Sequence, residues 1–527
     1  MLLFFWNRRN HLRSRLFSLM LAAAVALAGC SQGESVQSRE ETTANQGWKK
    51  AAILYSFKSS TLDPHNSATA LRAGIVETLV RLDRDLRLKP WLATKWEAKD
   101  AHTWEFTIRD GVAFQDGSKL DAAAVKASLA RGISVNKPLA RALKIASMKA
   151  TGQTLTIVTT EPHPSLPSEL VNPYSSVISC EAEKRAGREA FNLAPVGTGP
   201  FKVKQFIPDQ EIALERFAGY WDGAAKLHEV SFRFNEDGNV RALALQSGEA
   251  DIAYHLPAET VPAVQRDQRL QVKSVPGLRV HFLLYNQQKP QWQDRNLRKA
   301  IDLLLNRESM ARDIMLGHAA PANGPFPSVL PFGNPDEAGG QNLHEARKRL
   351  EAAGYRTGTD GKMTKDGKPL TLELLTYKGR PELPLIAQLL QADAAKIGIS
   401  VRIKTVENID TYLRENKEWD LVTYSNLSAP RGDGGFFLNA AFAPGGSLNA
   451  ANLTSIRLNA VVSQLNSTAD PAKRIDLTRE AVRIIHDEVL HSYAVHPNLI
   501  VGVNKRITGW HPGAEEFYIV TPQLDVK

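Results

Sequence analysis

The sequence predicts an α/β protein built from two or three domains. The chain has 527 residues, which is more than one hydrophobic core usually supports. Its central part, residues 196–234, holds three short segments that mix β-branched and aromatic residues with a period of about two, as strands do. Its second half alternates predicted strands with predicted helices, a pattern typical of a mainly parallel sheet.

The first half of the chain is expected to begin with a strand at residues 51–57 and a helix at residues 73–82. Alternation of polar and apolar residues predicts further strands at residues 103–109 and 153–159. We interpret residues 94–185, which hold these two strands, as a small separate lobe.

The central part and the second half of the chain are also expected to contain strands, which alternate with helices in the second half. Central strands are expected at residues 201–206, 211–216 and 229–234. Later strands at residues 370–376, 401–406 and 421–426 alternate with helices at residues 345–353 and 384–396, each helix ending close to a glycine. Two more segments, residues 274–285 and 492–503, are expected to cross between the two halves.

The first 29 residues have the pattern of a targeting segment. Four arginines between residues 8 and 15 precede an apolar stretch, residues 16–29, that is too short to span a bilayer comfortably. The stretch ends in Leu-Ala-Gly before Cys30, which resembles a bacterial lipobox, in which the cysteine is lipidated. An ordinary signal peptide is the alternative. Residues 31–47 are polar and read as a flexible tether.

Composition and motifs point away from catalysis and nucleic-acid binding. The formal charge of +9 falls to about +5 without the four arginines of the targeting segment, and no basic run follows. The other cysteine, Cys180, has no partner for a disulfide within the mature chain. The sequence lacks G-x-S-x-G, H-E-x-x-H, Walker and C-x-x-C motifs. The sequence therefore gives no indication of an enzyme.

Five motifs together resemble a known family. They are LDPH at residues 62–65, PWLATKW at residues 90–96, GTGPFKV at residues 197–203, YW at residues 220–221 and ALALQSGEADI at residues 242–252. In this order they resemble the extracytoplasmic solute-binding proteins of ABC importers, in the peptide/nickel-binding family (family 5). The resemblance implies a two-lobed periplasmic-binding-protein fold of type II, of the large class with an extra small lobe.

The resemblance also implies how the chain is divided and how it works. The lobes would close around a ligand about a hinge at the two crossing segments. The expected divisions, in chain order, are a signal peptide (1–29), a lipid-anchored tether (30–47), lobe I (48–93, 186–277 and 497–527), the small lobe (94–185) and lobe II (278–496).

The implied function is capture of a small charged solute and its delivery to the membrane permease and ATPase subunits of an importer. The favoured solute is a nickel or other metal chelate, and a di- or oligopeptide is the alternative. No cofactor is expected, and the protein is expected to be a monomer anchored outside the cytoplasm. A chemosensory receptor subunit would share this fold and ligand. A hydrolase would need a nucleophile and base, for which the sequence shows no signature.

A glycine-rich turn at residues 431–437 follows a predicted strand, as ligand-binding turns do at the edge of α/β sheets. By resemblance to the peptide-binding branch, Asp433 would pair with an amino group of the ligand. The alternative is an ordinary turn aspartate. Arg431 beside it suits a carboxylate, because a guanidinium binds both oxygens at once.

The chain departs from the nickel-binding branch at two segments. The branch carries an arginine where this chain has Asn172, and it carries a histidine and an aromatic residue where this chain has Ala140 and Ala142. Tyr174 and Arg141 lie in the same segments. The resemblance makes these two residues candidates for contact with the ligand, with Arg141 supplying positive charge.

Two histidines near the expected lobe junctions, His65 and His496, are further candidates for ligand binding. His491 and His496 are five residues apart on a predicted strand, so their side chains would point to opposite faces and would not share a metal ion. No set of metal ligands is assigned.

Overall fold

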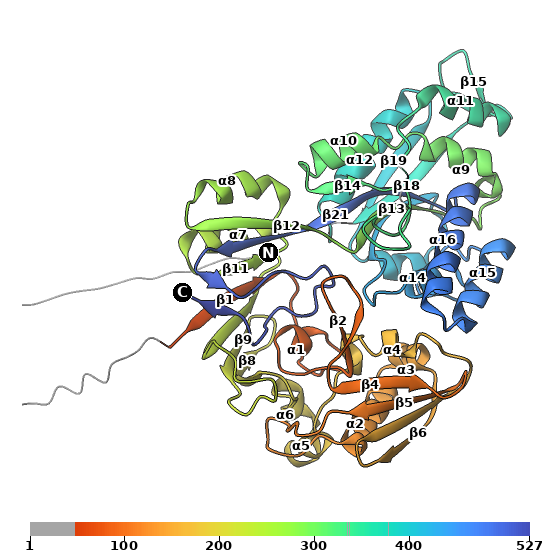
Figure 1. Ribbon diagram of the computed structural model, residues 1–527. Coiled ribbons are helices and arrows are strands. Elements are labelled where there is room, and N and C mark those ends of the chain that lie inside the picture. Colours follow the sequence, from red (N-terminus) through yellow and green to blue (C-terminus); the bar gives the residue numbers. More distant parts are fainter. Residues whose placement is uncertain (1–47, 335, 337, 378) are drawn as a thin grey trace, which may run out of the picture. The chain divides into compact units, whose positions relative to one another are not determined.

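The computed structural model describes residues 48–334, 336, 338–377 and 379–527 (Figure 1). The predicted signal peptide, the tether and Cys30 lie outside the described residues. Among the helices that are described, none combines the length and the apolar character needed to cross a membrane.

One long strand joins the two halves of the main sheet. The first half of β21 (His491–Asn504) pairs with β13 (Arg279–Tyr285), and its second half pairs with β11 (Ile252–Tyr254) and β12 (Leu270–Pro276). Figure 1 shows β21 running between the two sets of strands. The chain also passes from β12 to β13 through Gly277 and Leu278, so the two predicted crossing segments are confirmed as strands.

Lobe I contains parallel and antiparallel pairs. Its strands follow the spatial order β11, β1, β10, β9, β8, and β1 is parallel to both neighbours. The three predicted central strands are confirmed, because β branching and alternation suit a sheet with one buried face. Bounds are β1 (Lys50–Tyr55), β8 (Phe201–Ile207), β9 (Glu211–Arg216), β10 (Glu229–Phe234), α7 (Gly238–Ser247) and α8 (Val261–Arg266).

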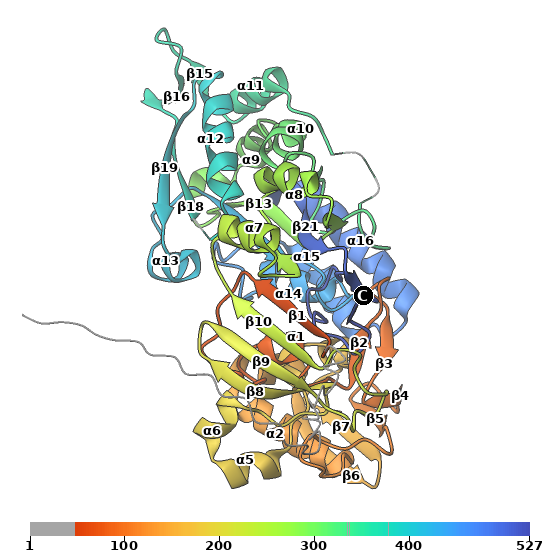
Figure 2. The ribbon, with the colours of Figure 1, turned by 90° about the vertical axis from the view of Figure 1, so that its left-hand side faces the viewer.

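Lobe II has a mixed sheet in the order β19, β18, β20, β13, β21. β18 runs parallel to β19 and β20, as the alternation of strands and helices predicted, whereas β13 pairs antiparallel with both neighbours. Figure 2 shows the helix α12 lying beside β18 and β19. Bounds are α9 (Arg295–Asp302), α11 (Leu343–Ala352), β18 (Thr371–Tyr377), α12 (Glu382–Ala395), β19 (Ser400–Val406), β20 (Leu421–Leu427), α14 (Gly435–Phe442), α15 (Ile456–Ser467) and α16 (Pro471–Glu488).

A separate four-stranded antiparallel sheet, ordered β4, β5, β7, β6, forms within the region predicted as the small lobe. The carboxylate of Asp121 accepts a hydrogen bond of 2.8 Å from the Ala124 N–H and so caps α2. The apolar core of this region is continuous with that of lobe I. Bounds are β4 (Ala93–Ala98), β5 (Thr103–Ile108), α2 (Ala122–Val135), α3 (Lys137–Leu143), β6 (Ile145–Thr151), β7 (Thr154–Thr159) and α4 (Leu166–Glu169).

The helix predicted at residues 73–82 is wrong. The short helix α1 (Thr69–Arg72) ends before Gly74, which adopts a φ of +68°, and the next element is β2 (Val80–Leu82), paired with β3 (Leu88–Pro90). The intervening chain is buried on all sides, so its apolar spacing reflects full burial and not one face of a helix.

Candidate functional site

The topology of the two lobes brings the carboxyl ends of parallel strands to the junction between them. In lobe I, β1 ends at Tyr55 and the parallel strand β11 ends at Tyr254. In lobe II, β18 ends at Tyr377 and the parallel strand β20 ends at Leu427. Open α/β sheets bind ligands outside the carboxyl ends of their strands. The residues that follow these ends therefore form the candidate site.

Aromatic and basic side chains make up the lobe I side of the junction. The ring of Tyr55 is buried, whereas that of Phe57 is 43% exposed. The guanidinium of Arg72 lies over the Tyr55 ring, 5.1 Å from its centroid. The Arg72 Nε–H donates a 3.0 Å hydrogen bond to the backbone carbonyl of Glu516. The C-terminal segment of the chain is thereby tied to the end of α1.

A hydrogen-bonded chain of three side chains lies beside these rings. The Ser56 Oγ is 2.6 Å from the Nδ1 of His255, and the Nε2 of His255 is 2.8 Å from the Oε2 of Glu516. Burial would raise the pKa of Glu516, but His255, Arg279 and Arg380 outweigh it and hold that pKa well below its ordinary value. Burial also lowers the pKa of His255. Glu516 is therefore a carboxylate at neutral pH.

Two arginines form the lobe II side. The guanidinium of Arg380 lies 5.5 Å from the centroid of the Phe57 ring, a cation–π contact that joins the two lobes. The Arg279 Nη1 donates a hydrogen bond of 3.3 Å to Ser425, and burial and Arg380 lower the pKa of Arg279 to about 10. Among the described residues, no carboxylate oxygen lies within 4 Å of the guanidinium nitrogens of Arg72, Arg279 or Arg380. We call these three residues the arginine cluster.

The predicted residues Arg431 and Asp433 both have partners within the protein. Arg431 forms an ion pair with Glu169 of α4, and its guanidinium lies 4.3 Å from the centroid of the Phe436 ring. Asp433 accepts hydrogen bonds of 2.8 and 3.0 Å from Arg474 and one of 2.7 Å from the Gly435 N–H. Their predicted ligand contacts stay predictions.

The turn that carries Arg431 also touches lobe I. A side chain at Gly432 would place its Cβ 2.3 Å from the carbonyl oxygen of Leu86, and Gly432 has a φ of +69°. Only glycine fits this position. The turn at residues 431–433 is therefore held between the β2–β3 hairpin of lobe I and α4.

Arg141 and Tyr174 lie on elements close to α4, the helix that carries Glu169. Arg141 is exposed in the last turn of α3, a helix that packs on α4. Tyr174 is partly buried in a short 3₁₀-helix (Pro173–Ser175), five residues after Glu169. Nothing in these contacts assigns either side chain a ligand.

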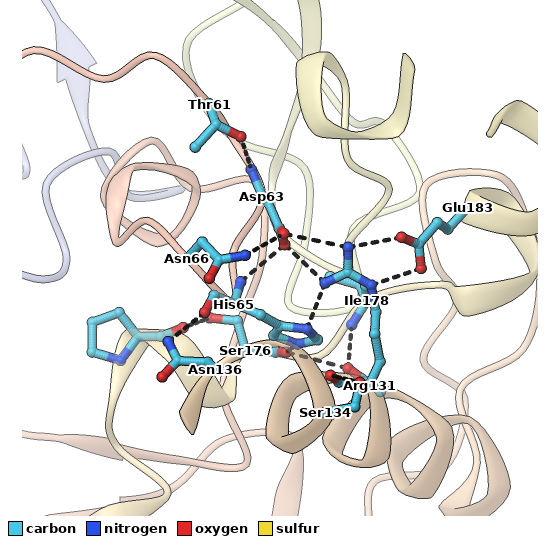
Figure 3. Close-up of polar contacts among 12 residues, drawn as sticks. Thr61, Asp63, His65, Asn66, Arg131, Ser134, Asn136, Ser176, Ile178 and Glu183 are labelled. Carbon is cyan, nitrogen blue, oxygen red and sulfur yellow. Dashed lines mark hydrogen bonds and ion pairs between the residues drawn. The ribbon is translucent and has the colours of Figure 1, made fainter. Parts of the chain in front are cut away.

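Figure 3 shows His65 inside a fully bonded cluster of charged and polar groups. Its Nε2 lies 3.0 Å from the carbonyl oxygen of Ser176 and its Nδ1 lies 2.8 Å from the Arg131 Nη1. Arg131 in turn pairs with Asp63 at 2.9 Å and with Glu183 at 2.7 Å. Burial and Arg131 lower the pKa of His65 to about 4. We call Asp63, His65, Arg131 and Glu183 the Arg131 cluster.

His496 lies where β21 passes between the lobes. Its Nδ1 is 3.3 Å from the carbonyl oxygen of Arg279, and its Nε2 has no hydrogen-bond partner among the described residues. Burial lowers its pKa to about 4. His491 instead packs against Phe282 and Phe442. His496 is thus the one predicted histidine that contacts a residue of the arginine cluster.

No group of three or more His, Cys, Asp or Glu side chains is placed to hold a metal ion in the part of the chain that the structure describes. A cavity of about 360 Å³ lies away from the junction, in lobe II, where Asp302 and Arg307 already pair with each other. None of the predicted site residues lines it.

Sequence reasoning missed Arg72, Arg279, Arg380 and Glu516. Arg72 is the last residue of α1, Arg279 is the first residue of β13, and Arg380 lies two residues before α12. Glu516 lies in the C-terminal segment outside the helices and strands. No motif surrounds any of them. The available signal was topological, because the predicted parallel strands already placed their carboxyl ends together.

The comparisons with known proteins now identify the family. The model of the bacterial extracellular solute-binding proteins, family 5, middle region, matches residues 87–449. The chain belongs to this family. It is therefore an extracytoplasmic solute-binding protein of an ABC-type importer, with the two-lobed fold, and is not an enzyme.

Three relatives show how close the similarity is. The nickel-binding protein NikA of Staphylococcus aureus is 30% identical over 508 residues, which are 96% of this chain and 98% of NikA. A nickel ABC transporter structure from Bacillus halodurans is 41% identical, with a TM-score of 0.78, and covers 91% of this chain and 100% of its own. The glutathione-binding protein GsiB of Salmonella paratyphi A is 26% identical over 88% of this chain and 92% of GsiB.

Proposed function

We propose that this protein captures a chelate of nickel or another metal at the junction between the lobes and delivers it to an importer. The observation that carries the proposal is the arginine cluster, in which Arg72 lies over the ring of Tyr55 and Arg380 lies over the adjacent ring of Phe57. Guanidinium groups bind carboxylates strongly and with defined geometry. A chelate presents carboxylates while supplying its own donors to the metal.

The relatives support the same ligand class. NikA of Staphylococcus aureus is named a nickel-binding protein, and its structure was determined in complex with Ni(L-His)₂, at 30% identity to this chain and a TM-score of 0.79. A peptide is the second candidate, because the glutathione-binding protein GsiB is also similar over most of the chain.

Calorimetric titration tests the proposal. The probes are Ni²⁺ with excess L-histidine, Ni²⁺ alone, L-histidine alone and glutathione. We expect the nickel–histidine mixture to bind at least about a hundredfold more tightly than any of the other three, a difference of about 2.7 kcal/mol. Tighter binding of glutathione than of the mixture would overturn the proposal in favour of a peptide.

We further propose that ligand binding closes the lobes about two crossings, at Gly277 and at Pro497 in β21. Lobe I would comprise residues 48–93, 186–277 and 497–527, and lobe II residues 278–496. Small-angle scattering should give a smaller radius of gyration with saturating ligand than without it. An unchanged radius at saturation would contradict closure.

Anchoring to the membrane through Cys30 completes the proposal. The basic segment, the apolar run and the small residues before Cys30 support it, and two or more acyl chains give stable attachment. The anchored monomer would reach its permease on the tether at residues 31–47. In cells fed a labelled fatty acid, Cys30→Ala should abolish incorporation into this protein. Unchanged labelling would contradict the anchor.

A further inference from the structure

Glu516 is a carboxylate held among the positive charges of the junction. Its side chain is 9% exposed. It pairs with His255 at 2.8 Å, and its own backbone carbonyl accepts the hydrogen bond from Arg72. Arg279 and Arg380 both act on its pKa from the side of lobe II. The carboxylate of Glu516 is therefore near enough to Arg279 and Arg380 to interact with both, and its backbone carbonyl binds Arg72.

The backbone adopts an uncommon conformation at this pair. Glu516 has a φ of +60° and His255 a φ of +52°. Residues other than glycine rarely adopt the left-handed region, and such strain is concentrated at functional sites. Ser56 then fixes the second nitrogen of His255 at 2.6 Å. Two strained residues and one hydroxyl thus hold a single carboxylate in place.

We propose that Glu516 sets the net charge of the chelate that the junction accepts, by cancelling one positive charge of the arginine cluster. The inference rests on the proposed function. The charged groups at the junction are the three arginines of the cluster, Arg241, whose guanidinium donates to the backbone carbonyl of His255, and two carboxylates, Glu516 and Glu382, the second of which pairs with His281 at 2.7 Å. Their sum is about +2, one less than it would be without Glu516, and it is complementary to an anionic chelate.

The expected selectivity follows from Coulomb's law. Charges about 8 Å apart at the edge of a protein interact appreciably, and solvent and salt reduce the effect. We expect replacement of Glu516 by a neutral residue to strengthen binding by about tenfold for each negative charge on the ligand, which corresponds to about 1.4 kcal/mol per charge. A dianionic chelate should gain more than a monoanionic one.

The test titrates the wild type, Glu516→Gln and Glu515→Gln with nickel–citrate, a monoanion, and nickel–EDTA, a dianion, at pH 6 and fixed ionic strength. Glu515 is the matched control, because burial raises its pKa to about 7 and its replacement at pH 6 removes little charge. Glu516→Gln should shift the affinity ratio toward nickel–EDTA by about tenfold, and Glu515→Gln by less than threefold.

Arg279→Gln provides an independent arm, which should shift the ratio by about tenfold toward nickel–citrate even where Glu516→Gln fails to fold. Wild-type protein that binds the chelates while folded Glu516→Gln keeps its ratio within twofold would overturn this inference alone, as would binding of nickel–histidine without either of these chelates. Wild-type protein that binds neither of these chelates nor nickel–histidine would overturn the proposed function together with it.

Discussion

The Arg131 cluster and the arginine cluster are made from the same residue types but are arranged differently. The guanidinium nitrogens of Arg131 form hydrogen bonds with Glu183, Asp63 and the Nδ1 of His65, with donor–acceptor distances between 2.7 and 3.4 Å (Figure 3). At the junction, Arg279 donates to a hydroxyl at 3.3 Å and Arg380 lies over an aromatic ring. Among the described residues, neither guanidinium has a carboxylate oxygen within 4 Å.

This difference separates charge that supports the fold from charge that is available to a ligand. When one partner of a buried ion pair is removed, the other charge is left buried without compensation, and the native state is strongly destabilised. Arginines without carboxylate partners have guanidinium N–H groups free to bind an anion. Their positive charges also repel one another, and a bound anion would reduce this repulsion. The comparison therefore predicts opposite consequences of substitution in the two clusters.

The largest expected effect is on stability, at Arg131. Arg131→Gln leaves the buried Asp63 and the partly buried Glu183 without their cation, which should lower the free energy of unfolding by about 3–5 kcal/mol. Denaturant unfolding measures this loss. Arg185→Gln is the control, because Arg185 is 62% exposed in its pair with Asp116 and should cost less than about 1 kcal/mol. Equal losses for both variants would contradict a structural role for Arg131 beyond that of an exposed ion pair.

The next effect is on binding, in the arginine cluster. Arg279→Gln or Arg380→Gln should weaken binding of a nickel chelate by about ten- to 150-fold, since a hydrogen bond to a charged group contributes about 1.5–3 kcal/mol. The free energy of unfolding should stay within about 1 kcal/mol of the wild type. Calorimetry and denaturant unfolding give the two readouts. A variant that loses stability but keeps its affinity would show that these arginines, like Arg131, support the fold and do not bind the ligand.

The pH dependence of stability sharpens the account of His65. Its pKa is about 4 in the folded protein and 6.5 in the unfolded chain, so the unfolded state binds the proton more tightly. Stability is therefore full above pH 6.5 and falls as the pH is lowered toward 4. Between pH 7 and 5 the loss from this residue is up to about 2 kcal/mol. His65→Gln should show a shallower decline in denaturant unfolding, and a parallel decline would contradict the assignment.

The smallest expected effect concerns the ion pair between Arg431 and Glu169, which links lobe II to the small lobe. If it holds the lobes together, Arg431→Gln and Glu169→Gln should each weaken chelate binding by about fivefold, or about 1 kcal/mol. The exchange of both charges, Arg431→Glu with Glu169→Arg, should restore the affinity. Loss in Arg431→Gln alone, without rescue by the exchange, would instead support the predicted contact of Arg431 with the ligand.

Much of the fold could be predicted from local patterns. The bounds of β9 and β10 match the prediction, because alternation over six residues reports a half-buried strand. Residues 73–82 do not form the predicted helix, because a segment buried on every side shows no periodic pattern that separates a helix from extended chain. The carboxylate of Glu77 in that segment is held by the Tyr220 hydroxyl at 2.6 Å and the Trp221 Nε1 at 2.9 Å, contacts between residues far apart in the sequence.

The candidate site was harder to predict for the same reason. The role of a charged residue depends on whether a partner reaches it, and those partners are distant in the chain. Asp433 meets Arg474 forty-one residues later, and Arg431 meets Glu169 from another lobe. Arg279 and Arg380 have no motif, and only the meeting of strand ends indicates them.

The most direct test of the account is a crystal structure of the protein grown with a nickel chelate, with anomalous diffraction data collected at the nickel absorption edge. We expect one strong anomalous peak at the junction, with the chelate's carboxylates within hydrogen-bonding distance of Arg279 and Arg380. The Arg131 cluster should keep the contacts shown in Figure 3. A nickel peak away from the arginine cluster, with Arg279 and Arg380 free of the chelate, would contradict the central claim.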